Sequence, residues 1–183
     1  IEEIVCEIPQ EVTSEWDEQS GAGMLTRDYE GNFYHFSEWS NTILCYDAML
    51  QKQKTITVPK FVYGIIQGND GSTAYWYGCD TSNKPVVGSI TDEKILLEKV
   101  EGIATDYCAE ISKEGILFLA DTQNVWRVED GILQKVFNFP ENGYIIREMY
   151  GMEAGEEGEI LFLVKMDGHL TLLNMKEIER PQE

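Results

Sequence analysis

The chain has 183 residues, of which 43% are hydrophobic and 11% aromatic, so length and composition predict a globular fold with a substantial core. Its 33 acidic and 14 basic residues give a formal charge of −19, which disfavours nucleic acid as a partner because phosphate binding needs clustered Lys and Arg. No apolar run is long enough to cross a membrane as a helix, so we expect no membrane insertion.

Strand-forming segments follow one another along the whole chain. The chain opens with a strand candidate at 4–9, followed by an insertion at 11–20. A first unit, 21–59, has expected strands at 24–28, 32–36, 43–46 and 55–58. A second unit, 60–101, has them at 62–67, 72–77, 86–90 and 96–100. A third unit, 102–140, has them at 107–111, 116–119, 125–128 and 136–139. A fourth unit, 141–183, has them at 145–150, 160–164 and 170–173, without a clear fourth strand.

A glycine turn marks the same place in each unit. The glycines are Gly31, Gly71, Gly115 and Gly158, at intervals of 40, 44 and 43 residues, and an acidic residue precedes each of them. Glycine accepts the positive φ that tight turns between antiparallel strands require. We therefore expect a hairpin turn at each of these positions.

A second polar turn recurs after the strand that follows each glycine. It contains Asn41, Asn83 and Asn124, at intervals of 42 and 41 residues, and Asp167-Gly168 takes this place in the fourth unit. Four short antiparallel strands joined by tight turns and repeated every 40 to 45 residues or so are typical of a propeller blade.

The predicted fold is therefore all-β: a β-propeller made of four four-stranded antiparallel blades, with almost no helix. We expect residues 1–183 to form a single propeller domain, in which residues 4–9 supply the outer strand of the closing or the preceding blade. Two architectures stay open: a closed four-bladed ring, or part of a larger propeller, built by a longer chain or by a homodimer of halves.

The step Asp28-Tyr29-Glu30-Gly31-Asn32, followed by a strand, a polar turn and an apolar strand, resembles the repeats of bacterial NHL-like and lactonase-like propellers. The resemblance extends from about residue 21 to residue 175. The dipeptide Trp16-Asp17 lies in the insertion and not at the end of a third strand, which disfavours a WD40 repeat proper.

The resemblance also implies where a ligand would bind. In such propellers the turns between second and third strands share one face with the connections between blades, around a central channel where related proteins bind ligands. The candidate ligand-binding residues on that face are Trp16, Glu38, Trp39, Asn41, Asp80, Asn83, Asp121, Asn124 and Asp167. Loops on a rigid scaffold are where binding is generally built.

Each group of candidates has two interpretations. Trp16 and Trp39 are either aromatic anchors for a ligand or ordinary packing of loops over the blade edge. Asp80, Asp121 and Asp167 are either ligands for calcium, which prefers carboxylate and carbonyl oxygens, or turn residues whose side chains bond their own backbone. The second interpretation is favoured, because no calcium-binding loop motif is present.

Residues of the kind that carry catalysis are few. His35 lies within an apolar strand, which favours a core role, and His169 occupies a turn. The four cysteines are widely scattered without C-x-x-C spacing, so we expect buried free thiols, with two disulfides as the alternative. We assign no catalytic residue and no cofactor.

Together these observations predict a non-catalytic module that recognises a protein, peptide or glycan ligand, in a bacterium and outside the cell or on its surface. The alternative is a lactonase-like or lyase-like enzyme that holds a divalent metal ion in the central channel. A third hypothesis is a structural segment of a multidomain protein. Fold analogy alone does not decide among the three.

Overall fold

The computed structural model describes residues 23–37, 41–59, 61–68, 74–91, 94–97, 102–104, 106–129, 132–155 and 158–176. The first sheet consists of β1 (Gly23–Arg27), β2 (Phe33–Ser37), β3 (Thr42–Tyr46) and β4 (Lys52–Thr57). The second consists of β5 (Phe61–Gln67), β6 (Ala74–Cys79), β7 (Pro85–Ser89) and β8 (Ile95–Leu97).

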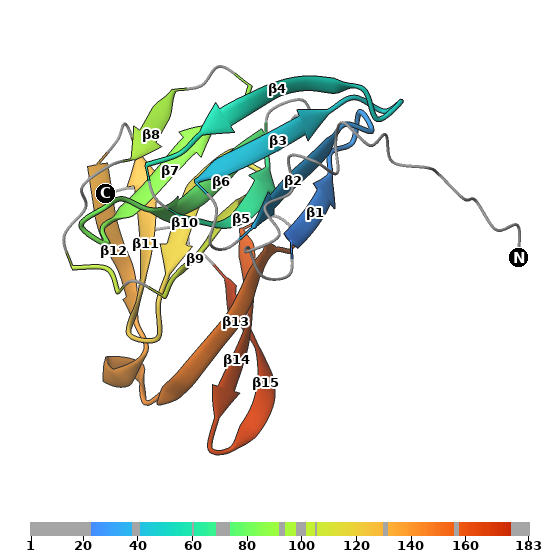
Figure 1. Ribbon diagram of the computed structural model, residues 1–183. Coiled ribbons are helices and arrows are strands. Elements are labelled where there is room, and N and C mark those ends of the chain that lie inside the picture. Colours follow the sequence, from blue (N-terminus) through green and yellow to red (C-terminus); the bar gives the residue numbers. More distant parts are fainter. Residues whose placement is uncertain are drawn as a thin grey trace, which may run out of the picture.

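The third sheet consists of β9 (Cys108–Ile111), β10 (Leu117–Ala120), β11 (Asn124–Glu129) and β12 (Ile132–Asn138). After a short 3-10 helix, η1 (Pro140–Asn142), the fourth sheet consists of β13 (Ile146–Ala154), β14 (Glu159–Met166) and β15 (His169–Lys176). Figure 1 shows the sheets following one another in chain order, from the first at the upper right to the fourth at the bottom.

All four sheets are antiparallel, and in each of them strands pair in the order in which the chain makes them. This arrangement confirms the predicted all-β propeller fold. Among the described residues the fourth sheet has three strands, and it shares no ladder with the first sheet. The strand predicted at 4–9 lies outside the described residues, and so do residues 98–100 of the strand predicted at 96–100.

The predicted glycine turns have a common hydrogen-bonding pattern. In the first sheet Gly31 N donates to Asp28 O at 3.1 Å, and in the third Gly115 N donates to Ser112 O at 2.8 Å. Both glycines have positive φ, 92° and 81°. Gly158 is also in this conformation, with a φ of 73°, whereas Gly71 lies outside the described residues. The requirement for glycine at these turns is therefore conformational.

The hydrophobic core lies between consecutive sheets as three separate clusters. The cluster between the first and second sheets includes Phe36, Ile43, Val62 and Trp76. The cluster between the second and third includes Val87, Leu117, Leu119 and Trp126. The cluster between the third and fourth includes Phe118, Val125, Phe162 and Val164. Trp76 and Trp126 are thus both buried in the core.

Each sheet consequently has two faces with different neighbours. We call the face turned toward the next sheet along the chain the forward face, and the opposite one the backward face. In β10, Phe118 and Ala120 belong to the forward face, whereas Leu117 and Leu119 belong to the backward face. This alternation follows from the two-residue period of a strand, and it gives sheets that are apolar on both sides.

Close packing within the second sheet requires a glycine. Gly88 lies directly across from Trp76 in the ladder between β6 and β7. A Cβ atom at position 88 would lie 2.5 Å from the indole nitrogen of Trp76, well inside van der Waals contact. Because Gly88 has no side chain, the indole ring of Trp76 can pack directly over its backbone.

Candidate functional site

The loop face of the molecule, as predicted, is formed by the turns between second and third strands together with the connections between sheets. Val58, just after β4, donates its N–H to Asn41 O at 2.8 Å. Phe139, just after β12, donates its N–H in the same way to Gln123 O at 2.8 Å. These bonds hold the start of each connection against the polar turn of its own sheet.

The Asp80 carboxylate is engaged by the turn that it begins. Its Oδ1 accepts hydrogen bonds from Ser82 N at 2.8 Å and from Lys84 N at 2.9 Å. The main chain closes the same turn, with Asn83 N donating to Asp80 O at 3.0 Å. This is the behaviour expected of an aspartate that stabilises a turn by mimicking a backbone acceptor.

Asp121 is buried, and its carboxylate binds both its own turn and the neighbouring connection. Oδ1 accepts from Gln123 N at 2.7 Å and from Asn124 N at 2.8 Å. Oδ2 accepts from Ala104 N at 3.0 Å, and Ala104 belongs to the connection between the second and third sheets. Because both oxygens are bonded, Asp121 joins two segments of the loop face.

The remaining described candidates have conformational or packing roles. Asn83 and Asp167 have positive φ, 59° and 50°, a conformation that Asn and Asp tolerate better than most residues. Asn124 is buried as the first residue of β11, where its Oδ1 accepts from Asn138 Nδ2 of β12 at 2.9 Å. Asn41 uses its backbone carbonyl, as described above.

No group of three or more His, Cys, Asp or Glu side chains within the described ranges is arranged to hold a metal ion. The other candidates, Trp16, Glu38 and Trp39, lie outside the described residues. A ligand role for them stays a prediction, as does calcium binding. The described cysteines, Cys45, Cys79 and Cys108, are free thiols, whereas Cys6 lies outside the described part.

The first strands of the second, third and fourth sheets lie next to one another, with β9 between β5 and β13. They hold a carboxyl group that the sequence analysis missed. Burial raises the pKa of Glu110 on β9 to about 7, with a further contribution from the charge of Glu153 on β13, although a hydrogen bond from Ile111 N opposes the shift. Burial also raises the pKa of the nearby Cys108 thiol to about 11.

Three tyrosines pack together where β5 and β6 meet the connection to β9. The ring centroids of Tyr63, Tyr77 and Tyr107 lie 5.6 to 6.5 Å apart. The Tyr107 hydroxyl donates toward Gly78 O at 2.7 Å and accepts from Gly78 N at 3.1 Å. Burial raises the pKa of Tyr107 far above its usual value, so this hydroxyl stays protonated and acts as a structural link between sheets.

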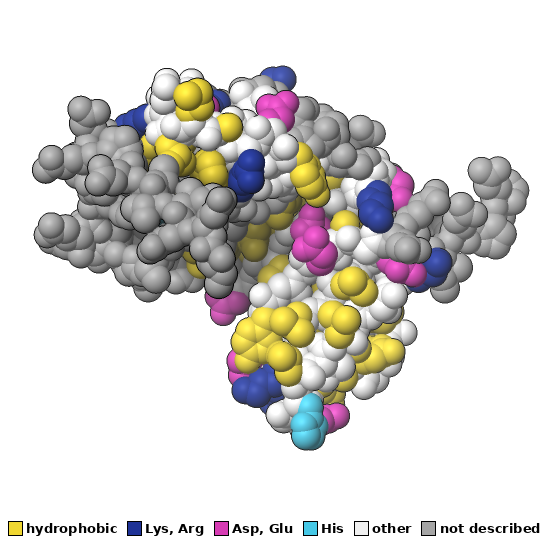
Figure 2. Space-filling model, turned by 90° about the vertical axis from the view of Figure 1, so that its right-hand side faces the viewer, with side chains coloured by type: hydrophobic (Ala, Val, Ile, Leu, Met, Phe, Trp, Pro, Cys, Tyr) yellow, Lys and Arg dark blue, Asp and Glu magenta, His cyan; other side chains and the backbone are white. Residues whose placement is uncertain are grey.

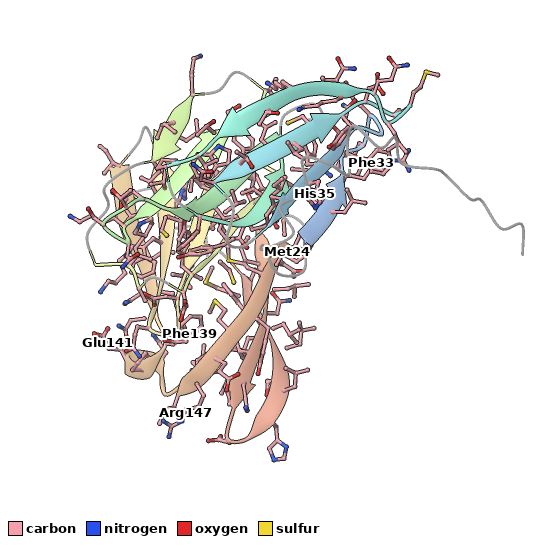
Figure 3. The ribbon with its side chains drawn as sticks, in the orientation of Figure 1. Met24, Phe33, His35, Phe139, Glu141 and Arg147 are labelled. Carbon is pink, nitrogen blue, oxygen red and sulfur yellow. The ribbon has the colours of Figure 1, made fainter. Side chains whose placement is uncertain are left out.

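The connection between the third and fourth sheets exposes apolar side chains on the loop face. Figure 3 shows Phe139 and Glu141 beside η1, where Phe139 is buried and Glu141 is exposed. After η1, Tyr144 and Ile145 are exposed hydrophobic side chains. Exposed aromatic and aliphatic groups on a loop that is anchored at both ends are suited to contact with a ligand.

Comparison with solved structures identifies similar folds at low sequence identity. Virginiamycin B lyase from Staphylococcus aureus, in a catalytically inactive form with quinupristin, is similar over 91% of this chain and 59% of its own, with a TM-score of 0.59 and 17% identity. A streptogramin B lyase matches over 87% and 55%, with a TM-score of 0.57 and 14% identity. The WD40 β-propeller domain of Doa1 matches over 81% and 48%, with a TM-score of 0.56 and 15% identity.

These similarities show the fold, and the chain spans about half to three fifths of the length of the propellers that it matches. No family model matches the sequence, and no curated protein matches it. The narrower resemblance to NHL-like or lactonase-like repeats therefore stays a prediction. Within the described residues, none of the helical structure is long and apolar enough to span a membrane.

Proposed function

We propose that this chain is a non-catalytic recognition module that binds a protein, peptide or glycan ligand at its loop face. The observation that carries the proposal is the use of the loop-face carboxylates. Asp80 and Asp121 accept backbone hydrogen bonds from their own turns, so their oxygens serve the scaffold. Such a face offers a ligand neutral polar turn tips, the exposed carboxylates of Glu141 and Asp167, and exposed apolar residues.

The chemistry of the described loop face favours a ligand bound by packing and hydrogen bonds. The exposed residues at its turns include Ser82, Asn83 and Gln123, and Tyr144 and Ile145 are exposed apolar residues of the connection between the third and fourth sheets. Amphipathic aromatic side chains contribute much of the binding energy of such surfaces at a small entropic cost. We place the module outside the cell or on its surface, on the strength of the repeat resemblance alone.

A binding screen tests this proposal. The purified chain is the bait for a displayed peptide library and for a glycan array, and hits are compared with the double variant Tyr144→Ala, Ile145→Ser. We expect that variant to lose at least about tenfold in affinity, which corresponds to the loss of roughly 1.4 kcal/mol of contact energy. Tyr29→Ala is the matched control, because Tyr29 is an exposed aromatic residue in the glycine turn at the opposite end of the first sheet.

The control must bind like the wild type. If Tyr29→Ala weakens binding as much as the double variant does, the ligand does not bind at the loop face. If neither screen yields a ligand whose binding depends on Tyr144 and Ile145, the proposed site is wrong.

A second candidate function, lyase-like or lactonase-like catalysis, is favoured by Glu110. A carboxyl group with a pKa of about 7 exchanges a proton near neutral pH, as a general acid or base must. Two of the similar propellers are lyases. Incubation with sugar lactones and with a type B streptogramin, followed by mass spectrometry, tests this candidate. Turnover that Glu110→Gln abolishes and the exposed control Glu30→Gln preserves would establish catalysis and displace the recognition proposal.

A further inference from the structure

The forward face of the fourth sheet is an apolar surface that no described residue covers. Leu163 of β14 lies directly across from Leu172 of β15 in the ladder. Leu170 stands one pair further along on the same face, and the exposed fractions of Leu170 and Leu172 are 66% and 65%. Figure 2 shows hydrophobic side chains spread over the lobe at the bottom, whose tip carries a histidine.

The same face is an interface in the three preceding sheets. The second strand of each sheet presents apolar residues forward: Tyr34 and Phe36 in the first, Tyr75 and Tyr77 in the second, Phe118 and Ala120 in the third. In the first three sheets these residues pack against the following sheet. Leu161 and Leu163 occupy the corresponding places in β14, so this face continues a series of established sheet-to-sheet interfaces.

Among the described residues, the edge of the fourth sheet is unpaired as well. In each of the other sheets a fourth strand pairs with the third, whereas the only partner of β15 among the described residues is β14. An unpaired edge beside an apolar face is a template for association with another sheet.

The polar side chains on the forward face of this sheet bind one another. The hydroxyl group of Tyr150 donates to Glu148, and Lys165 forms an ion pair with Glu148 at 2.9 Å.

Charge makes this surface suitable for a second copy of the same acidic chain. The strands β13, β14 and β15 contain three acidic residues, Glu148, Glu153 and Glu159, and three basic residues, Arg147, Lys165 and Lys176. Their formal charge is therefore zero, in a chain whose charge is −19. Two copies that meet at this sheet bring together surfaces that carry no net like charge.

The first sheet offers less exposed apolar surface for a head-to-tail contact. On its backward face Leu44 and Tyr46 are buried, with exposed fractions of 6% and 4%, and Leu25 on the edge strand β1 is the large hydrophobic residue of that face that is exposed among the described residues. A second copy can therefore present its own fourth sheet more readily than its first. We propose that the forward face of β13–β15 is a two-fold symmetric dimer interface, in which the same patch of both copies packs together.

The mass of the chain in solution tests this proposal. Analytical ultracentrifugation over a range of about 1 to 200 µM is expected to show a dimer of twice the 20.9 kDa chain mass, dissociating on dilution. The double variant Leu170→Glu, Leu172→Glu places four charges in the interface and should be a monomer throughout. The matched control Leu25→Glu changes a leucine of the first sheet that is 65% exposed, and it should remain a dimer.

A monomeric wild type over the whole range overturns the proposal and leaves the face to a different sheet or partner. A double variant that stays dimeric, or a control that becomes monomeric, overturns it as well. Should the double variant fail to fold by circular dichroism, hydrogen exchange on the wild type decides the question. The amides of β15 must then exchange faster after dilution to the monomer, and unchanged exchange contradicts the proposed interface.

Discussion

Asp121 has a carboxylate that is buried and accepts three backbone N–H groups, from Ala104, Gln123 and Asn124. Replacement by alanine leaves these donors without their acceptor in a site that water reaches poorly, which is costly. We expect Asp121→Ala to lower the free energy of unfolding by about 3 kcal/mol in urea denaturation. Asp80→Ala, which removes two bonds at a more exposed turn, should cost about 1 kcal/mol. Equal losses would contradict a linking role for Asp121.

Glu110 gives the stability a distinctive pH dependence. Its pKa is raised from 4.5 to about 7 in the folded state, so the folded chain binds more protons than the unfolded chain between these values. Its contribution to stability is present below pH 4.5 and is lost as the pH rises to about 7. Glu110→Gln removes this loss. Between pH 4.5 and 7.5 the free energy of unfolding of the variant should therefore rise relative to that of the wild type by up to about 3 kcal/mol. Urea denaturation at a series of pH values measures this difference. The same pH dependence of the free energy of unfolding in both proteins would contradict the raised pKa of Glu110.

For single residues, the sequence predicted those features that depend on neighbouring residues in the chain. The positive φ of Gly31 and Gly115 follows from turn geometry, and the turn role of Asp80 follows from its own side chain. The bond from Ala104 to Asp121 joins segments 17 residues apart and could not be predicted without the sheet arrangement. Glu110 could have been noticed as a single carboxylate in an otherwise apolar strand, but its neighbour Glu153 belongs to another sheet.

At the scale of the strand, alternation decides which substitutions matter. Phe162 is fully buried between the third and fourth sheets, whereas Leu163, the next residue in β14, lies on the forward face of the fourth sheet and is exposed. Phe162→Ala should cost about 3 to 5 kcal/mol through lost burial and the cavity that remains. Leu163→Ala should cost under about 1 kcal/mol in the monomer, because it buries little there. Urea denaturation measures both, and comparable losses would contradict the assignment of the two faces.

The repeat made most strands predictable, because a period of two within each strand and one of about 40 residues between turns are both visible in a single sequence. The ends of the strands were harder to predict. β13 runs to Ala154 and β14 begins at Glu159, so both extend beyond the predicted 145–150 and 160–164. These extensions depend on pairing between two long strands, including register shifts in β13, which local composition does not encode.

At the scale of the whole molecule, charge and packing are segregated. The described strands carry five of the 33 acidic residues and eight of the 14 basic ones, a formal charge of +3. The other 28 acidic residues lie outside those strands, so few like charges meet where sheets pack against one another, Glu110 and Glu153 being one such pair, while the rest of the chain is strongly acidic. The amino-acid composition determines the total charge of the chain. Where that charge lies in the fold became clear only from the strand boundaries.

The central claim is that the loop-face carboxylates of Asp80 and Asp121 stabilise turns and leave recognition to the neighbouring side chains. Amide chemical shifts of the ¹⁵N-labelled chain during titration with calcium to about 10 mM, against sodium chloride of equal ionic strength, test it most directly. We predict that the amides of Ser82, Lys84, Gln123 and Asn124 stay at their positions, because they remain bonded to Asp80 and Asp121. Saturable shifts of these four amides with calcium, absent with sodium, would contradict the account.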